Sequence, residues 1–345
     1  MGTMHRVPTF SPEQLRAAAT AVLRAAGADE ANAAIVVDHL VDANLTGHDS
    51  HGVILIPDYV QAIRQGQIVS TARPEVVRQT SAMTLIDARR SFGQVSAVFA
   101  TDAVVAKARE HGVAVAGTIR GNHIGRLGYY PTRAAAQGVA LLVTRGSLGG
   151  SVVPYGGRAG VLGTDPIAFG FPVEGEDPFV LDFATTVIAA GKVRFARDKH
   201  EPVPPNTLLD KAGRPTTDPN ALFQGGALLP FGGHKGYALS LMTVLLSSVL
   251  IRDDADDADD SGGDVGKAFF CAIDTRVFGG GAPAAAAGVL RRVRAVPPAE
   301  GFEHVLIPGE PELRTAERRR AEGVPVAEDT WRGIAAVAAD LGVSV

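Results

Sequence analysis

The first part of the chain carries apolar residues at helical spacing. Ser11, Pro12 and Gln14 predict the start of one helix, because Ser11 can cap the first turn, Pro12 suits the first helical position and Gln14 completes a capping box. A second helical pattern begins near Asp29, and Gly47 predicts where it ends. The amino-terminal region is therefore expected to be helical, with a tight polar turn directly after the second helix.

From about residue 80 the pattern changes to short apolar runs typical of buried strands. Helical stretches lie between them at 96–110 and 127–137. Strands that alternate with helices favour a layered α/β domain. The expected strands are 84–88, 113–119, 139–144, 167–173 and 179–184.

The last third of the chain is less regular. A Pro-rich loop is expected at 202–219, an apolar helix at 237–251 and a solvated, flexible loop at the acidic stretch 253–264. The tail, about 314–341, returns to a helical pattern. Because both ends are helical, we expect them to pack together beside the sheet domain. The expected division is 1–75 plus 310–345 as a helical terminal region, and 76–309 as a central α/β domain that binds cofactor and substrate.

Composition narrows the class of protein. The 345 residues are 46% hydrophobic, which is enough for a large core, and the formal net charge is −4. Basic and acidic residues are interspersed, so we expect no nucleic-acid partner. The single cysteine, Cys271, fits a reducing compartment. The beginning of the sequence has no apolar signal core, and residues 237–251 are too short to span a membrane. A soluble cytoplasmic protein without a membrane partner is expected.

Polar, glycine-bracketed clusters interrupt the apolar runs at four places. They are GHDSHG (47–52), GNHIGRLGYY (121–130), LDFATT (181–186) and FGGHKGYAL (231–239). Each lies where a predicted strand ends or a helix begins, which is where ligand-binding groups are usually displayed. Any one cluster also fits ordinary turn chemistry, but the four together favour one composite site. Asp182, in an otherwise apolar strand, needs a partner, and an imidazole would be a good one.

The first cluster allows several chemistries. His48 and His51 have the spacing of a metal pair, but the segment follows a helix stop and lacks the glutamate of HExxH, so no metal is expected. A hydrolytic triad is disfavoured because no GxSxG surrounds Ser50. A purely structural turn stays open, with Asp49 and Ser50 satisfying nearby N–H groups. The dinucleotide fingerprint GxGxxG is absent, which argues against a Rossmann domain.

In order and in detail, these clusters resemble the malate/L-lactate dehydrogenase family that is distinct from the Rossmann enzymes. The likeness spans nearly the whole chain and includes GTDP (163–166), PTTDP (215–219) and PGE (308–310). HIGRLGYY and GHDSHG followed by IPDYV are most similar to its hydroxycarboxylate dehydrogenase B branch. The resemblance implies an α/β, non-Rossmann, L-sulfolactate-dehydrogenase-like fold, with a large mixed, mainly antiparallel sheet flanked by helices. It also implies a homodimeric oxidoreductase that uses NAD or NADP and a small carboxylate substrate.

The resemblance also implies roles for individual residues. His51 resembles the proton donor to a carbonyl oxygen, and Ser50 and Asp182 resemble the relay partners that orient and charge it. His123 matches a second acid–base histidine of relatives, so the division of work between the two stays open. The implied cofactor-contacting positions are His51, His123, Gly125, Arg126, Leu127, Leu181, Asp182, Phe183, Ala184, Thr185, His234, Lys235, Gly309, Glu310, Pro311 and Glu312.

Two positions depart from the family pattern. Several branches carry an arginine five residues after the motif serine, where it grips the substrate carboxylate, but this chain has Leu55. Arg126 is the predicted replacement, so Arg126 and His51 are the expected substrate-binding residues. Asp165 stands where many relatives have asparagine. The prediction is hydride transfer to or from C2 of a 2-oxo/2-hydroxy acid, and the alternatives are a cyclic imine reductase or a non-catalytic ligand-binding relative.

Overall fold

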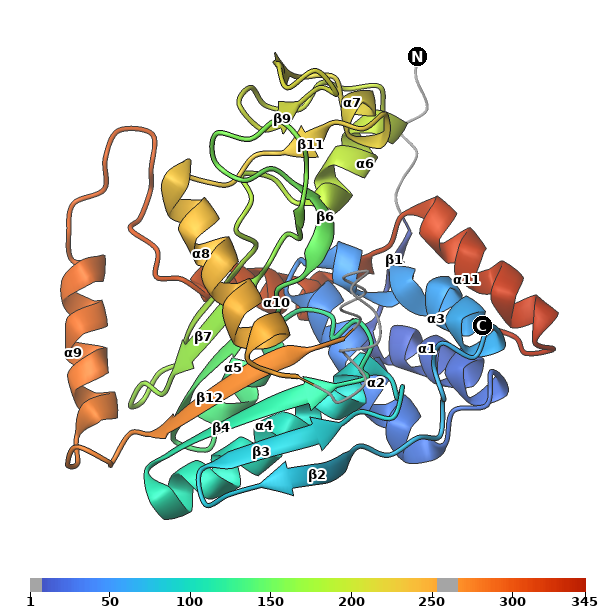
Figure 1. Cartoon of the computed structure of the whole chain (residues 1–345). Helices are drawn as coiled ribbons and strands as arrows, with labels where there is room; N and C mark the ends of the chain where they lie inside the picture. Colours follow the sequence, from blue (N-terminus) through green and yellow to red (C-terminus); the bar gives the residue numbers. More distant parts are fainter. Residues whose placement is uncertain (1–7, 253–265) are drawn as a thin grey trace.

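A seven-stranded sheet forms the centre of the protein in the computed structural model, which describes residues 8–252 and 266–345 (Figure 1). The acidic stretch 253–264 lies outside these residues, and its expected flexibility stays a prediction. Strands β3 and β4 are parallel, and all other neighbours in the sheet are antiparallel. The sheet is therefore mixed and mainly antiparallel, as the family resemblance implied. Its order is β2 (Glu75–Gln79), β3 (Met83–Asp87), β4 (Val113–Ile119), β12 (Ala268–Asp274), β5 (Val139–Thr144), β7 (Ile167–Phe171) and β8 (Phe179–Phe183).

Alternate residues of the sheet enter two different cores, as the pleat of a strand requires. On β12, Phe270 faces the core beneath the long helix, whereas Phe269 packs on the opposite face with Ile251. Gly117 of β4 makes room there, because a Cβ at this position would lie 2.7 Å from Ile251. The first face is covered by α4 (Gly93–His111) and α5 (Tyr129–Ala135), and the second by α8 (His234–Val244) continuing into the π-helical turn η3 (Leu245–Val249).

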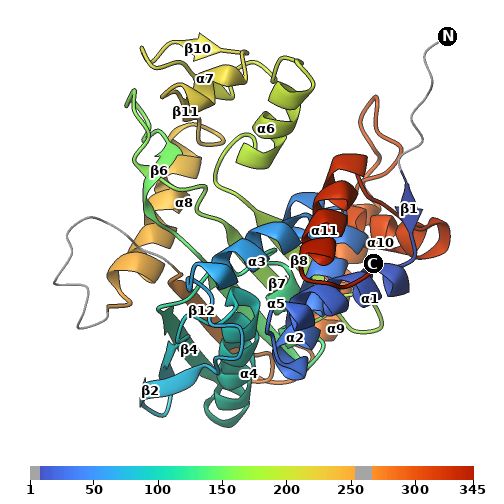
Figure 2. The same ribbon diagram turned by 90° about the vertical axis from the view of Figure 1, so that its right-hand side faces the viewer.

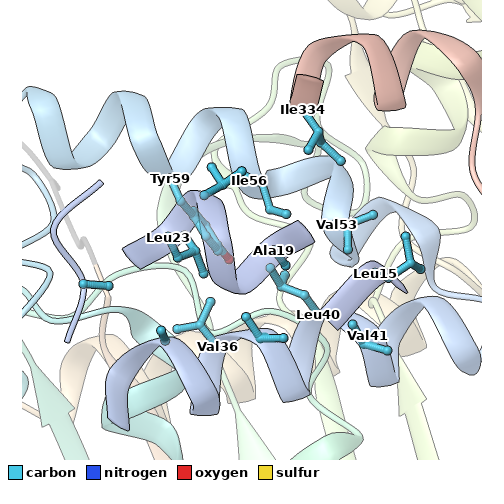
Figure 3. Packing of buried hydrophobic residues seen from close by; sticks show 14 of the residues in the cluster. Leu15, Ala19, Leu23, Val36, Leu40, Val41, Val53, Ile56, Tyr59 and Ile334 are labelled. Atoms are coloured by element: carbon cyan, nitrogen blue, oxygen red, sulfur yellow. The ribbon is translucent and has the colours of Figure 1, made fainter. Parts of the chain in front are cut away.

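Helices from the two ends of the chain pack together beside the sheet, which confirms this part of the expected fold. Ser11 and Gln14 form the predicted capping box. Leu15, Leu40 and Ile334 meet in one buried cluster (Figure 3). The elements are β1 (Thr9–Phe10), α1 (Pro12–Ala25), α2 (Glu30–Leu45), the short 3-10 turns η1 (Asp49–His51) and η2 (Val53–Leu55), α3 (Ile56–Arg64), α10 (Glu310–Glu322), β13 (Val324–Pro325) and α11 (Glu328–Asp340). The division of the chain at 75 and 310 stays a prediction.

A smaller four-stranded sheet lies at one end of the molecule, beyond the carboxyl end of β8 (Figure 2). The stretch 202–219, predicted to be a loop, contributes two of its short strands, because Leu208 and Leu209 are buried there. Its order is β10 (Pro215–Thr216), β9 (Leu208–Leu209), β11 (Ala227–Leu228) and β6 (Leu148–Val152), accompanied by α6 (Ala190–Asp198) and α7 (Asn220–Phe223). Helix α9 (Ala282–Arg294) stands apart from the sheets (Figure 1).

Every helix within residues 8–252 and 266–345 is too short or too polar to cross a lipid bilayer.

Candidate active site

The turn after α2 is held in place by a buried asparagine. The Asn44 side chain donates to Asp49 Oδ1 (2.8 Å) and accepts from the Val53 N–H (2.8 Å). A Cβ on Gly52 would lie 2.2 Å from Asn44 Oδ1, so only glycine fits at that position. From α10, Arg319 forms two further bonds to the Asp49 carboxylate. The polar turn is therefore rigid, and its geometry depends on residues from both ends of the chain.

Within this turn, Ser50 and His51 form a hydrogen-bonded pair. Ser50 Oγ lies 3.0 Å from His51 Nδ1. Side chains adjacent in sequence seldom meet, but the 3-10 turn brings these two together. Burial and the nearby Arg126 guanidinium lower the pKa of His51. His48, by contrast, lies near Thr46 Oγ1 (3.4 Å), and burial lowers its pKa to about 4. His48 thus fits the structural turn residue that the sequence suggested.

His123 lies beside His51. The two ring centroids are 5.5 Å apart with an interplanar angle of 30°. Part of His123 is open to solvent, yet the surrounding protein and the neighbouring His51 lower its pKa. The start of α4 supports the loop from below, because a Cβ on Gly93 would lie 2.2 Å from the His123 carbonyl oxygen. The imidazoles of His51 and His123 lie side by side, and either can serve as proton donor or acceptor.

The glycine-rich loop after His123 rests on a buried histidine that the sequence reasoning missed. His39 of α2 is fully buried, and its Nε2 lies 3.1 Å from the Arg126 carbonyl oxygen. Gly125 has φ +71°, and a Cβ there would lie 2.1 Å from His39 Cε1. Burial lowers the pKa of His39 to about 3, so the neutral ring donates to the carbonyl. Nothing in the sequence pattern separates His39 from an ordinary buried polar residue.

Arg126, the predicted anchor for a substrate carboxylate, is buried and already paired. Only 6% of the residue is exposed, and its Nη2 lies 3.2 Å from Asp42 Oδ2. Direct binding of a substrate carboxylate would therefore require Arg126 to release Asp42 or to share its guanidinium. The anchor role of Arg126 stays a prediction.

Asp182, the predicted relay partner, accepts a hydrogen bond from the Gly128 N–H at 2.7 Å. Burial raises its pKa, whereas the Arg126 guanidinium opposes that rise. In the part of the chain that the structure describes, no hydrogen bond joins Asp182 to His51. The relay between Asp182 and His51 that the family resemblance implies stays a prediction.

The remaining predicted positions line the end of β8 and the starts of two helices. The Thr185 N–H donates to the Thr164 carbonyl, and the Phe231 N–H donates to the Thr185 carbonyl, which connects β8 to α8. His234 and Lys235, at the start of α8, are exposed. At the start of α10, Glu310 is bound by Arg294 and by the Ile307 N–H rather than left open for a ligand. The other positions of this group are Leu181, Phe183, Ala184, Gly309, Pro311 and Glu312.

Asp165, which stands where many relatives have asparagine, is a buried acid. It is 2% exposed, has φ +40°, and accepts bonds from the Ser147 N–H (3.0 Å) and the Ser240 hydroxyl. Burial raises its pKa above the usual value. A raised native pKa means that the folded protein loses stability as the pH rises from the unfolded pKa through the native pKa.

Asp165→Asn should therefore raise the Tm at pH 7 by about 1–2 °C, corresponding to about 1 kcal/mol, and the gain should disappear near pH 4. Asparagine tolerates the same backbone conformation and can donate to the Ser240 hydroxyl. Thermal unfolding at several pH values measures this effect. Asp274→Asn is the matched control, because Arg276 lowers the pKa of Asp274 to about 2 and its replacement should lower the Tm at pH 7. A lower Tm for Asp165→Asn at pH 7 would contradict the expectation.

Comparison with known proteins identifies the family of this chain. A family model described as malate/L-lactate dehydrogenase matches residues 10–335. The chain belongs to the malate/L-lactate dehydrogenase family. Within this family it is 34% identical over 341 residues to hydroxycarboxylate dehydrogenase B of Escherichia coli K12, covering 97% of this chain and 94% of that protein.

A solved structure and a second relative extend the comparison. Sulfolactate dehydrogenase from Methanocaldococcus jannaschii superposes with a TM-score of 0.87 at 32% identity, covering 98% of each chain. A Pseudomonas putida protein named delta(1)-pyrroline-2-carboxylate/delta(1)-piperideine-2-carboxylate reductase is 38% identical over 248 residues, which is 72% of each chain. The proteins that this chain resembles thus include some named for hydroxy acids and some named for cyclic imines.

Proposed function

We propose that this protein transfers a hydride between a nicotinamide cofactor and C2 of a small 2-oxo/2-hydroxy carboxylic acid. The observation that carries the proposal is the Ser50–His51 pair, held on a rigid turn beside His123, in a chain of the malate/L-lactate dehydrogenase family. A positioned imidazole is the usual proton donor or acceptor for such a reaction.

His51 has the geometry for this work. Ser50 Oγ occupies Nδ1, so Nε2 is the nitrogen that can give a proton to the carbonyl oxygen during reduction or take it back during oxidation. Ser50 orients the ring. Because the pKa of His51 is lowered, reduction should improve toward acidic pH, where more of the imidazole is protonated, and oxidation should persist at neutral pH. His123 is the second acid–base candidate.

Asp182 and Arg126 supply charge to the same region. Burial raises the pKa of Asp182, while the Arg126 guanidinium and the hydrogen bond from the Gly128 N–H oppose that rise. Arg126 and His51 are the proposed substrate-binding residues. A carboxylate substrate would gain from the positive charge of Arg126 even without direct contact, since burial strengthens such interactions.

The residues at the end of β8 and at the starts of α8 and α10 fit a nicotinamide dinucleotide, either NAD or NADP. Phe183 is 39% exposed beside Asp182 and offers a flat apolar surface, and Lys235 is an exposed cation suited to phosphate. Gly191 leaves space next to Ser50, because a Cβ there would only reach ordinary contact at 3.4 Å. When bound, the reduced cofactor supplies the hydride. The proposed contacts are His51, His123, Gly125, Arg126, Leu127, Leu181–Thr185, His234, Lys235 and Gly309–Glu312.

A direct assay tests the proposal. The protein is mixed with NADH or NADPH and a panel of 2-oxo acids, and the absorbance of the reduced cofactor is followed. Oxidation of the cofactor that depends on a 2-oxo acid is expected with at least one of the two cofactors. The absence of turnover across a broad panel with both cofactors would reject the proposed function.

Reduction of a cyclic imine is the second candidate, because one relative is named as a pyrroline- and piperideine-2-carboxylate reductase. Both reactions add a hydride to a carbon next to a carboxylate, so the same panel should include cyclic ketimines. Preference for ketimines over 2-oxo acids would favour this second function.

We also propose that the protein works as a homodimer in the cytoplasm. Helix α9 buries only Ala287 among its residues, whereas Val289 and Val293 are 57% and 40% exposed. An apolar helix face of this kind is typical of a surface that a second subunit covers. A second copy of this chain is the partner that the family resemblance implies.

A further inference from the structure

Asp42 lies on α2 at the junction between the terminal helices and the site. Its carboxylate Oδ2 is 3.2 Å from Arg126 Nη2, and 29% of the Asp42 side chain is exposed compared with 6% of the Arg126 side chain. The same helix supplies His39, whose Nε2 binds the Arg126 carbonyl at 3.1 Å. Helix α2 therefore holds Arg126 of the glycine-rich loop through both its backbone and its side chain.

A second carboxylate, Asp182, lies near Arg126. A Cβ placed on Gly128 would lie 2.7 Å from Arg126 Nη1 and 3.0 Å from Asp182 Oδ2, so both groups border the same small space. Arg126 is therefore paired with Asp42 and has Asp182 as a second neighbour. A buried cation in this position is strongly coupled to its neighbours because water screens it poorly.

The groups that face His51 are mostly neutral. They are His39 from α2, His48 from the same turn, His123 from the loop, and Arg126. Arg126 is the member of this set that is always charged. Farther out, Asp42 interacts with Asp38, Arg16 and Arg320, and Asp182 interacts with Glu312. In the same turn, the Asp49 carboxylate is paired with Arg319 (2.7 Å). Arg126 is therefore the cation that acts on His51, and Asp42 is the carboxylate paired with it.

We propose that Asp42 is a positioning residue for His51: by pairing with Arg126, Asp42 limits the positive charge that the histidine experiences. It thereby sets the pH range in which the histidine can give or take a proton. Asp42 acts through Arg126 and touches no reacting atom. The inference rests on the proposed acid–base role of His51.

Two substitutions with opposite effects test the inference. Asp42→Asn leaves the charge of Arg126 less compensated, so the midpoint of kcat/KM against pH for reduction should move to lower pH by about half a unit or more. Arg126→Gln removes the cation and should move the same midpoint to higher pH. Asp42→Glu keeps the charge and should restore a midpoint close to that of the unmodified protein. Because the two expected shifts have opposite signs, each variant tests the inference even if the other fails to fold.

Asp38→Asn is the matched control. It removes one carboxylate from the same helix, one turn earlier, but Asp38 binds Arg16 (3.0 Å) and the Tyr129 hydroxyl (2.7 Å) rather than Arg126. Because Asp38 acts on Asp42 only through its charge, the midpoint of Asp38→Asn should shift much less than that of Asp42→Asn. A different result for Asp42→Asn, a lower KM for the 2-oxo acid without any shift of the midpoint, would overturn the inference. That result would mean that Arg126 exchanges Asp42 for the substrate carboxylate.

A measurement without turnover separates this inference from the proposed function. The chain has nine histidines, so an NMR titration of histidine ring signals, with His51 assigned by His51→Gln, reports its protonation directly. Asp42→Asn should lower the pH at which His51 titrates, and Arg126→Gln should raise it. Failure of the assay together with these NMR shifts would reject the dehydrogenase function alone. Unchanged His51 titration in both variants would reject the role of Asp42.

Discussion

Replacing His51 by alanine should lower kcat/KM for 2-oxo acid reduction by roughly 10²–10⁴, the usual contribution of a general acid. The imidazole is the group that Ser50 orients at 3.0 Å, so the substitution removes the positioned proton donor. Steady-state rates at saturating cofactor measure the effect. The variant should stay folded, because the turn is fixed by Asn44 and Asp49 rather than by the imidazole.

His48→Ala is the matched control, since it removes an imidazole from the same turn. His48 lies near Thr46 Oγ1 (3.4 Å) and has no proposed part in proton transfer, so near-normal rates are expected. His123→Ala measures how much of the proton transfer depends on the second ring. Near-normal turnover in His51→Ala, together with a large loss in His123→Ala, would transfer the catalytic role to His123.

Gly125→Ala should destabilise the fold by about 2–5 kcal/mol. A Cβ would lie 2.1 Å from the ring of the fully buried His39, and φ is +71°. Overpacking of a buried site costs roughly 1–3 kcal/mol, and the left-handed conformation costs an alanine about 1–2 kcal/mol more. Denaturant unfolding measures the loss. Because the loop carries the Arg126 carbonyl and guanidinium, the KM for the cofactor should also rise.

Gly138→Ala separates the cost of overpacking from the cost of the left-handed backbone conformation. Gly138 has φ +78°, but a Cβ there would meet no other atom within 4 Å, so only the conformational cost of about 1–2 kcal/mol applies. Combining His39→Ala with Gly125→Ala should recover part of the loss, since it removes the clash and leaves the strain. Equal stabilities for Gly125→Ala and Gly138→Ala would show that the loop can move away from His39.

The sequence predicted most strands of the large sheet because their apolar runs are short and bounded by turn residues. Strand β12, which lies between β4 and β5 near the middle of the sheet, was not predicted. Its apolar residues follow directly on the acidic stretch, and a short apolar run does not indicate which distant strands it will pair with. The strands β9 and β10 were missed for a related reason: each has only two residues, in a proline-rich segment.

The site shows a similar division. Ser50 and His51 are adjacent in the sequence, but their hydrogen bond depends on a turn geometry that no pattern encodes. The contact between Arg126 and Asp42 joins residues 84 positions apart, and Asp42 appears in the sequence as an ordinary polar residue of a helix. His39 and Asn44 were missed because a buried polar group is distinguishable from an exposed one only when its partners are known.

Helix α2 therefore acts as a rigid spacer for the site. Asn44 fixes the turn that carries His51, while His39 and Asp42 hold the loop that carries Arg126. These residues lie within residues 39–44 of one helix, so the two parts of the site cannot separate without breaking buried contacts. Changes in the length or pitch of α2 would therefore disturb proton transfer and cofactor binding together.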